Sequence, residues 1–332
     1  MKPFATGLVV GKFAPLHCGH EKLINTALAQ CEELFIISYS VPEMPDCEPE
    51  KRLTWLQVRF PQATILVLTP ELVARYNLPA IPHADADIHR HYVATLCLQI
   101  LRCRPHAVFT AEDYGDGFAN VLARRFAQPV EHVRMARPVG DEAPSGTLIR
   151  SDVHRYRYML ANDVYYSFVR RICLLGGEST GKSTLSKALA DGLDTVYVAE
   201  FGRDYWEEKN GILTADDLLH IACEQVRREQ QAEANHYLIC DTSPLTTLFY
   251  ALDQYGHAPQ ELHQLAEREY SLVVLCGAEF PFVQDGTRQG EVFRARQQVW
   301  YEQELSRRNI PYLSVSGPLQ ERVEQILRQL PD

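Results

Sequence analysis

The sequence lacks the features that mark several classes of protein. It has no excess of positive charge, because 33 Lys and Arg stand against 43 Asp and Glu, and the net charge of −10 argues against a general nucleic-acid or anionic-membrane binder. No hydrophobic run approaches the roughly 18 residues of a membrane span, and the N-terminus has no signal-peptide pattern. None of the nine cysteines forms a C-x-x-C pair, which is typical of buried thiols in a reducing compartment. We therefore expect a cytoplasmic protein with no membrane insertion and no nucleic-acid partner.

The sequence does contain alternating strand and helix patterns typical of α/β domains, and this alternation occurs twice. Its 332 residues, 46% of them hydrophobic, suit two domains of about 150 residues each. Strands are expected at residues 5–11, 33–38, 63–68 and 106–111, and then near 171–175, 194–199, 236–240, 271–276 and 311–315. Helical patterns separate them, near 19–31, 49–59, 88–102, 116–126, 182–191, 214–235, 243–254, 291–308 and 318–329. This alternation predicts two parallel-sheet α/β domains, residues 1–168 and 169–332. Residues 152–168 are compatible with a helix that bridges them.

The segment "GGESTGKST", residues 176–184, is the most specific motif. Gly176, Gly181, Lys182 and Ser183 satisfy G-x-x-x-x-G-K-[ST], after an apolar run and at the start of a helical pattern. Such a loop cradles a polyphosphate with its backbone N–H groups, while the lysine reaches the β- and γ-phosphates and the serine ligates Mg²⁺. We expect ATP to bind Gly176, Gly177, Glu178, Ser179, Thr180, Gly181, Lys182, Ser183 and Thr184. The alternative is a glycine-rich turn that only joins strand to helix.

A small-molecule kinase is the natural function for this second domain, since there is no N-K-x-D guanine motif. Such a kinase needs one carboxylate near the acceptor hydroxyl and one near Mg²⁺. Glu200 and Asp241 each end an apolar strand and are the candidates, with Asp241 also a candidate metal ligand. For Asp241 the alternative is a helix N-cap, because "DTSPL" also resembles a helix start.

Residues 285–298 carry Arg288, Arg294 and Arg296, which are candidates for a lid over the transferred phosphoryl group. The alternative is that these arginines lie on a solvated helix face.

The first domain has its own candidate loop, "GKFAPLHCGH", residues 11–20. His17 and His20 stand between a strand and a helix, where imidazoles can donate hydrogen bonds to phosphate oxygens. The alternative is a zinc pair, but no third ligand stands at convincing spacing.

These motifs resemble those of known families. "GKFAPLHCGH" and "SGTLIR" (145–150) resemble the two signatures of the nucleotidyltransferase superfamily. Together with "LLGGESTGKST", "AEFGRDY", "DGTR", "FTAEDYGD" and "RLTWLQ", nearly the whole chain resembles the NadR type, the bifunctional nicotinamide-mononucleotide adenylyltransferases/ribosylnicotinamide kinases.

The resemblance implies roles for both domains. In the first domain, His17 and His20 would bind the ATP phosphates and stabilise the transition state, assisted by Lys12. Gly11 and Phe13 would belong to the same site, and Thr147 and Arg150 would hold phosphate. The reaction would join nicotinamide mononucleotide to ATP, giving NAD and pyrophosphate. The second domain would phosphorylate nicotinamide riboside with ATP and Mg²⁺, with Arg203 of "AEFGRDY" at the substrate or lid.

Two departures from the family limit this interpretation. No N-terminal helix-turn-helix segment precedes the first strand, so we do not expect transcriptional repression, and residues 81–92 contain no Trp, which leaves pyridine selectivity open. Two alternatives also stay open: the same chemistries on another nucleoside or phosphate ester, and a non-catalytic nucleotide sensor. The oligomeric state is not written in the sequence, and a homo-oligomer remains an option.

Overall fold

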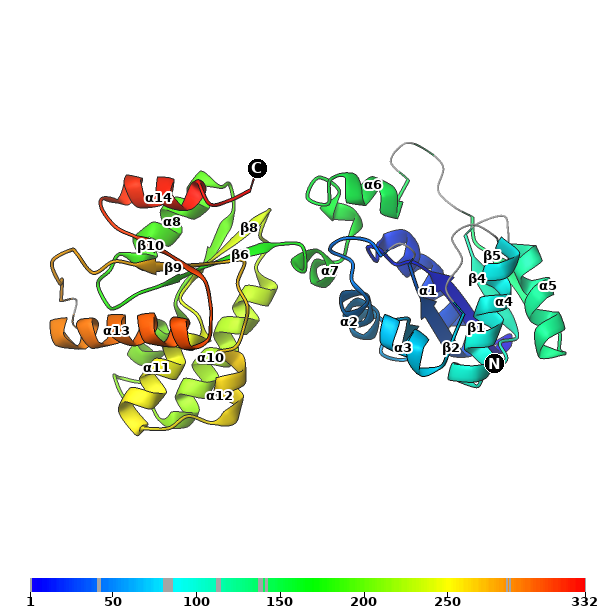
Figure 1. The fold of residues 1–332 in the computed structure, drawn as a ribbon, viewed down its shortest axis with the longest axis horizontal. Coiled ribbons are helices and arrows are strands. Elements are labelled where there is room, and N and C mark those ends of the chain that lie inside the picture. Colours follow the sequence, from blue (N-terminus) through cyan, green and yellow to red (C-terminus); the bar gives the residue numbers. More distant parts are fainter. Residues whose placement is uncertain are drawn as a thin grey trace. The chain divides into compact units, whose positions relative to one another are not determined.

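Two five-stranded sheets organise the chain in the computed structural model (Figure 1), and every strand pair in them is parallel. The structure describes residues 2–40, 43–79, 86–111, 115–136, 140, 143–284, 286 and 288–331. The chain divides into unit 1, Met1–Phe168, and unit 2, Val169–Asp332, each with its own sheet. The predicted fold class, two parallel-sheet α/β domains, is confirmed.

The sheet of unit 1 has the strand order β3-β2-β1-β4-β5, which puts β1 in the centre. Its strands are β1 (Phe4–Gly11), β2 (Cys31–Ser38), β3 (Thr64–Val67), β4 (Ala107–Thr110) and β5 (Glu131–Arg134). The chain runs outward from β1 through β2 to β3 and then crosses to β4 on the other side of β1. In open parallel sheets, ligands bind beyond the carboxyl ends of the strands at such a reversal.

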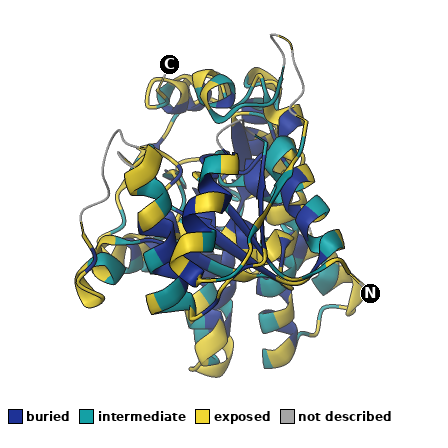
Figure 2. Cartoon of the chain, turned by 90° about the vertical axis from the view of Figure 1, so that its right-hand side faces the viewer, coloured by how far each residue is buried: buried dark blue, intermediate teal, exposed yellow. Residues whose placement is uncertain are grey.

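Helices cover both faces of this sheet (Figure 1). The helices of this unit are α1 (Cys18–Gln30), α2 (Pro49–Arg59), α3 (Pro70–Arg75), α4 (Ala86–Leu96) with its π-helical continuation (Cys97–Leu101), α5 (Gly115–Phe126), α6 (Gly146–Ser151) and α7 (Asn162–Tyr166). Side chains of α4 and α5, among them Leu96 and Leu122, pack with Leu8 and Ile37 of the strands into one core. Figure 2 shows that the buried residues concentrate on the strands and on the inner sides of the helices.

Unit 2 repeats the arrangement with the order β10-β9-β6-β8-β7, and β6 is central. Its strands are β6 (Arg170–Leu175), β7 (Val196–Val198), β8 (Tyr237–Asp241), β9 (Leu272–Cys276) and β10 (Tyr312–Val315). Its helices are α8 (Lys182–Gly192), α9 (Phe201–Glu208), α10 (Ala215–Gln231), α11 (Pro244–Tyr255), α12 (Gln260–Leu265), α13 (Glu291–Arg307) and α14 (Leu319–Leu327).

Alternate residues of β6 face two separate cores. Ile172 and Leu174 pack with residues of α8 and α14, whereas Cys173 and Leu175 pack with residues of α10, α11, α12 and α13. The two sets of helices therefore lie on opposite faces of the sheet (Figure 1). Because both faces are covered, the strand is apolar along most of its length, which is why its position was predictable.

The expected long elements are present, and the differences concern short or polar ones. Residues 152–168 do not form a bridging helix: Asp152 Oδ1 accepts a hydrogen bond from the Arg155 amide at 2.9 Å, and turns, a 3₁₀ turn and the short α7 follow. Sequence patterns also missed β5, α3, α9 and α12, because elements of four to eight residues carry little periodicity.

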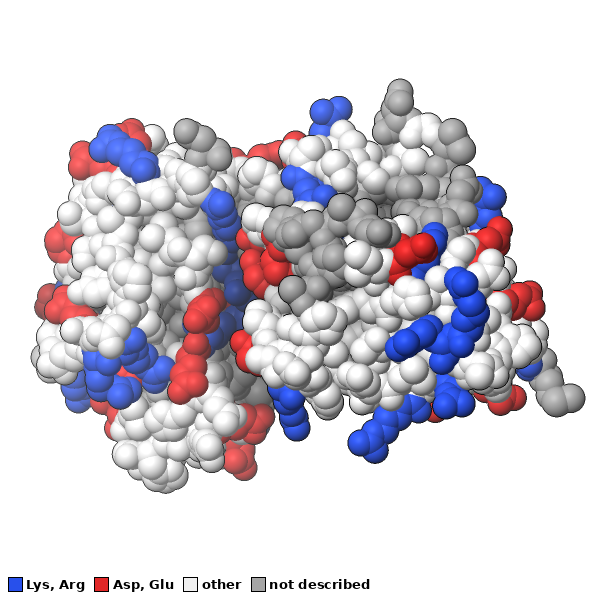
Figure 3. Space-filling model, turned by 45° about the vertical axis from the view of Figure 1, so that its right-hand side comes forward, with Lys and Arg blue, Asp and Glu red and all other residues white. Residues whose placement is uncertain are grey.

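Charge is distributed without a single broad basic field on the face in Figure 3, where acidic and basic side chains are interspersed among the residues drawn in colour. Within the described part of the chain, the helices are all too short or too polar to cross a bilayer.

Candidate active sites

The histidine loop, residues 11–20, joins β1 to α1 at the centre of the first sheet. His17 is the N-cap of α1, and its Nδ1 accepts a hydrogen bond from the Gly19 amide at 3.2 Å. The His20 ring stacks on the His17 ring, with 3.7 Å between centroids and 24° between planes. Both predicted imidazoles therefore lie side by side at the carboxyl end of β1.

Buried side chains fix the histidine loop in position. Phe13 is fully buried, and its ring meets the edge of the His20 ring with 5.0 Å between centroids. The carbonyl of Lys12 accepts from Ser38 Oγ at 3.1 Å and from Arg52 Nη1 at 3.3 Å, while the Lys12 side chain is exposed. Arg52 is itself fully buried and also donates to Ser38 Oγ at 2.9 Å and to Glu43 Oε2 at 2.7 Å. The backbone of the loop is thus fixed.

The second nucleotidyltransferase-like segment, residues 145–150, packs onto the first. Ser145 caps α6 by accepting from the Leu148 amide at 3.1 Å, and Arg150 donates to the carbonyl of Ala14 in the histidine loop. Arg150 Nη2 also lies 3.4 Å from Thr147 Oγ1. Only glycine fits at position 146, since a Cβ there would lie 2.8 Å from the Ala14 carbonyl oxygen. The fold therefore brings together two motifs separated by about 125 residues.

The zinc alternative for the histidine pair would require a third ligand. Across the residues that the structure describes, no group of three or more His, Cys, Asp or Glu side chains is arranged to hold a metal ion.

In unit 2, residues 176–184 form a P-loop between β6 and α8. The loop turns through positive φ angles at Gly176 (143°), Ser179 (60°) and Gly181 (81°), and a Cβ at Gly176 would lie 2.8 Å from the Cys276 carbonyl oxygen. Lys182 folds back over the loop, and its Nζ donates to the carbonyls of Gly176 (3.0 Å) and Gly177 (3.2 Å). The lysine therefore lies across the concave side of the loop, where a polyphosphate would bind.

Helix α13 supports the first half of the P-loop from outside. Gln298 Oε1 accepts from the Gly177 amide and Gln297 Oε1 from the Glu178 amide, both at 3.0 Å. Arg294 is buried, and its guanidinium donates to the Phe280 carbonyl (2.8 Å) and to Glu291 (3.0 Å). The two glutamines thus fix the P-loop at Gly177 and Glu178.

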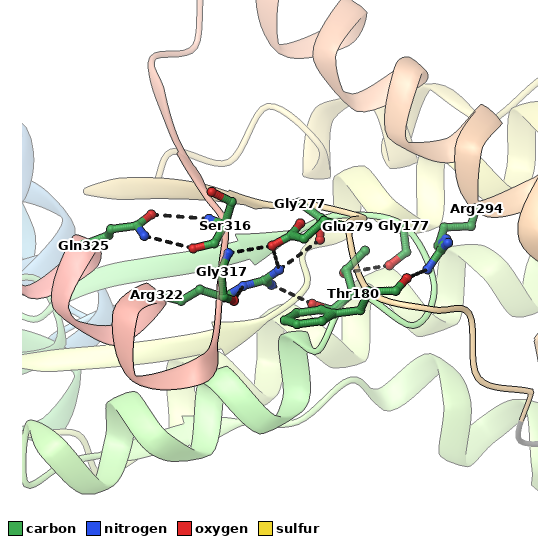
Figure 4. Close-up of polar contacts among 10 residues, drawn as sticks. Gly177, Thr180, Gly277, Glu279, Arg294, Ser316, Gly317, Arg322 and Gln325 are labelled. Atoms are coloured by element: carbon green, nitrogen blue, oxygen red, sulfur yellow. Dashed lines mark hydrogen bonds and ion pairs between the residues drawn. The ribbon is translucent and has the colours of Figure 1, made fainter.

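Arg322 of α14 supports the second half (Figure 4). Its side chain is 2% exposed, and its guanidinium lies 4.4 Å from the centroid of the Phe280 ring. It donates to the carbonyls of Thr180 (2.8 Å), Gly317 (2.8 Å) and Gly277 (3.2 Å), and to the carboxylate of Glu279. One side chain thus connects the P-loop to the loops that follow β9 and β10.

A cavity of about 360 Å³ opens beside the P-loop. One side is the loop itself, residues 178–184. The remaining wall comes from Glu200, Gly202, Arg203 and Trp206 around α9, Leu213, Leu218, Ile221 and Gln225 at α10, Thr242, Thr246, Thr247, Tyr250 and Gln254 around α11, and Arg288, Gln289 and Gln297. The cavity therefore has a charged end at the loop and a more apolar end between α9, α10 and α11.

The two candidate carboxylates occupy different positions. Asp241 ends β8 and is 1% exposed, and its carboxylate hydrogen-bonds the Ser183 hydroxyl. Glu200 precedes α9, is half-buried, and lines the cavity without capping the helix through its side chain. Burial raises the pKa of both groups, and Lys182 partly opposes the rise in each case. Asp241 thus lies beside Ser183, whereas Glu200 faces the cavity.

Of the four arginines predicted at the substrate or lid, Arg203 and Arg288 line the cavity. Arg294 is instead buried, with its side chain packed against Gly177 of the P-loop, and Arg296 is exposed and pairs with Asp253 at 2.9 Å. Parts of two further motifs, Asp285 with Thr287 and residues 112–114, lie outside the described residues, as do residues 81–85 of the Trp-free segment.

Sequence patterns did not identify several cavity residues, including Trp206, Tyr250 and Gln225. One signal was present for Gln225: it stands seven residues after Leu218 and four after Ile221, so a polar amide occupies the apolar stripe of a predicted helix. Arg52 and Arg322 gave no such signal in helix periodicity, because a charged residue in a helix is ordinarily exposed, and Arg52 was noted only as the first residue of "RLTWLQ".

Comparisons with known proteins agree with the resemblance drawn from the motifs. A family model described as an AAA domain matches residues 171–322. The chain is 29% identical over 311 residues to the trifunctional NAD biosynthesis/regulator protein NadR of Escherichia coli (strain K12), a match that covers 85% of this chain and 71% of that protein. The protein of the same name from Salmonella typhimurium (strain LT2) is 29% identical over 308 residues, with the same coverage.

Solved structures of NadR share the fold. The chain resembles NadR in complex with NR with a TM-score of 0.63 and 19% identity, over 97% of this chain and 95% of that one. For NadR in complex with NAD and AMP-PNP the TM-score is 0.61 at 19% identity, and the match covers 99% of this chain and 96% of that one. The predicted resemblance to the NadR type is therefore confirmed.

Proposed function

We propose that this chain is a two-site enzyme of NAD biosynthesis. Unit 2 phosphorylates nicotinamide riboside with ATP, and unit 1 joins the resulting mononucleotide to the adenylyl group of a second ATP. The observation that carries this proposal is that each unit has its own motif-bearing loop, residues 11–20 or 176–184, at the carboxyl end of the central strand of its own sheet. The similarity to NadR, which has been crystallised with NR and with NAD and AMP-PNP, supports the choice of ligands.

In unit 2 the acceptor hydroxyl attacks the γ-phosphorus of ATP, a new P–O bond forms, and ADP leaves. Glu200 takes the hydroxyl proton, because it lines the cavity and its raised pKa makes it a better base than an exposed glutamate. Lys182 holds the β- and γ-phosphates in place of the two carbonyls that it contacts here.

The residues beside the P-loop fit a Mg²⁺ ion. Within the described part of the chain, Asp241 Oδ1 is buried and has no hydrogen-bond partner, and such an oxygen suits a hard cation. Ser183 and Asp241 would hold the ion, and when bound it would neutralise charge on the phosphates. Asp241 is accordingly assigned to the metal and Glu200 to the proton.

Unit 1 needs no protein base. Its nucleophile is the phosphate of the mononucleotide, whose second pKa of about 6 leaves it ionised at neutral pH. Its oxygen attacks the α-phosphorus of ATP, the bond to the β-phosphate breaks, and pyrophosphate leaves. His17, His20 and Arg150 then act by positioning the phosphates and by stabilising the developing charge.

The test is to incubate the wild-type chain with nicotinamide riboside and Mg·ATP and to follow all products by chromatography. We expect mononucleotide to appear before NAD, with one ADP and one pyrophosphate released for each NAD. NAD formation without ADP would contradict the kinase assignment. Accumulation of mononucleotide without any NAD, including when mononucleotide is added directly, would contradict the adenylyltransferase assignment.

A further inference from the structure

The α10 wall of the unit 2 cavity, which is otherwise formed by leucine and isoleucine, contains one polar side chain that the proposed chemistry does not use. Gln225 of α10 lines the cavity and is 2% exposed. It continues the helical stripe of Leu218 and Ile221, which also line the cavity. An amide in such a stripe requires hydrogen-bond partners, since a buried polar group without them is destabilising.

The backbone fixes the orientation of this amide. Gln225 Oε1 accepts a hydrogen bond from the Phe201 amide at 3.0 Å. Because the backbone N–H can only donate, the amide oxygen must face it, and the –NH₂ group cannot take its place. Among the residues that the structure describes, no atom accepts a hydrogen bond from Gln225 Nε2. The two hydrogens of Gln225 Nε2 can therefore donate to an acceptor on a bound ligand.

The position of Gln225 indicates which part of a substrate supplies that acceptor. Phe201 follows Glu200 directly, so Gln225 is anchored to the backbone just beyond the proposed base. The reacting hydroxyl must lie at Glu200 and Lys182, at the P-loop end of the cavity. The rest of the substrate then extends toward the wall of Trp206, Leu218 and Ile221, which suits a flat ring.

We propose that Gln225 is a specificity-determining residue of the kinase site, and that its Nε2 donates to the carbonyl oxygen of the carboxamide on the pyridine ring of the acceptor. This inference rests on the proposed function, since it presumes a pyridine riboside as acceptor. It offers a source of pyridine selectivity outside the Trp-free segment.

The first experiment uses the wild-type chain and three ribosides. The first carries the carboxamide, the second an acetyl group that keeps the carbonyl but has no –NH₂, and the third has an unsubstituted pyridine ring. We expect kcat/KM to be similar for the first two, within about fivefold, and at least about thirtyfold lower for the third, because the buried donor then stays unpaired. An acetyl riboside as poor as the unsubstituted one would overturn the proposal.

The second experiment uses Gln225→Met, which has a similar shape without either hydrogen bond. Gln254→Met is the matched control, since Gln254 lines the same cavity from α11. The preference for carboxamide over unsubstituted riboside should collapse to within about threefold in Gln225→Met and persist in Gln254→Met. Because this preference is a ratio within one protein, partial loss of folded enzyme does not change it.

Two results of the second experiment count against the assignment. An unchanged preference in Gln225→Met, or an equal loss for both ribosides that leaves the ratio intact, would show that Nε2 contacts the ribose or nothing at all. A wild-type chain that phosphorylates none of the three ribosides would instead contradict the proposed function itself, so the two failures are distinguishable.

Discussion

The two units place their loops at the same point of the same kind of sheet but build them from different groups. In unit 1 the groups that we propose contact phosphate are side chains, the stacked imidazoles of His17 and His20. In unit 2 the proposed groups are the backbone of the P-loop after Glu178 and the amine of Lys182. The carboxylates of Glu200 and Asp241 stand close enough to Lys182 to feel its charge. A parallel sheet therefore supplies a place for phosphate, and the loop decides the chemistry.

The difference follows from the two nucleophiles that we propose. A phosphate is already charged at neutral pH, so positioning and electrostatic stabilisation suffice in unit 1. A hydroxyl must lose a proton, so unit 2 needs a base as well as a cation beside the phosphates. Four predictions test how complete this separation is.

The largest effect is expected from removing the cation or imidazole of one loop. Lys182→Ala should lower the kinase rate by at least about 10²-fold, roughly 3 kcal/mol of transition-state stabilisation, and leave adenylyl transfer from added mononucleotide unchanged. His20→Ala should do the opposite and stop the chain at accumulated mononucleotide. Both activities are measured on each purified variant, with circular dichroism as the check of folding. If either folded variant lost both activities, one shared site would replace the two-site comparison.

Substituting Glu200 and Asp241 one at a time distinguishes the roles proposed for the two carboxylates. Glu200→Gln should lower kinase kcat by about 10²-fold or more at saturating Mg²⁺, because the amide cannot accept the hydroxyl proton. Asp241→Asn should instead raise the Mg²⁺ concentration needed for half-maximal activity, since Asp241 holds the unpaired buried oxygen. Titrations of Mg²⁺ for both variants give the answer. A Glu200→Gln chain with normal kcat, and an Asp241→Asn chain without activity at any Mg²⁺ concentration, would exchange the two roles.

The pH dependence sharpens the same contrast. Burial raises the pKa of Glu200 above its ordinary value of 4.5, against the opposing charges of Lys182 and Arg203. A base acts only when deprotonated, so kinase kcat/KM should be full above this raised pKa and fall as the pH drops through it. This fall in kcat/KM at low pH should be absent from the residual kinase activity of Glu200→Gln. Adenylyl transfer should keep its own acid limb in both proteins, near the second phosphate pKa of about 6.

Much of the fold and the presence of both loops followed from the sequence, whereas their supports did not. The central strands β1 and β6 are apolar over most of their length and lead into glycine-bearing motifs, which are local signals. By contrast, β5 has the sequence "EHVR", in which three of four residues are polar, and only pairing with β4 makes it a strand. The anchoring of the loops is a long-range property: 40 residues separate Arg52 from Lys12 and 142 separate Arg322 from Thr180. No periodicity reports contacts over such distances.

Arg52 and Arg322 hold the loops of the two units in similar ways. Arg52 and Arg322 are both buried, each donates to a backbone carbonyl of its loop, and each pairs with a glutamate that is partly exposed, Glu43 (44%) or Glu279 (38%). The unrelated loops are thus held in the same way, by a guanidinium whose several donors fix more than one segment at once. Lysine keeps the charge but has no planar fork, so it cannot satisfy the same acceptors.

The smallest effect is therefore expected from Arg52→Lys and Arg322→Lys. Each substitution should weaken ATP binding in its own unit by about 1 kcal/mol, because the loop is held less well. The KM for ATP in that unit's reaction should rise roughly fivefold, with little change in kcat, because the reacting groups remain. Arg322→Lys should affect the kinase alone and Arg52→Lys adenylyl transfer alone, which makes each variant the control for the other. ATP titrations of both activities in both proteins give four KM values. If kcat fell with KM unchanged, or if both activities declined together, the arginines would support the general fold and not the position of the loops.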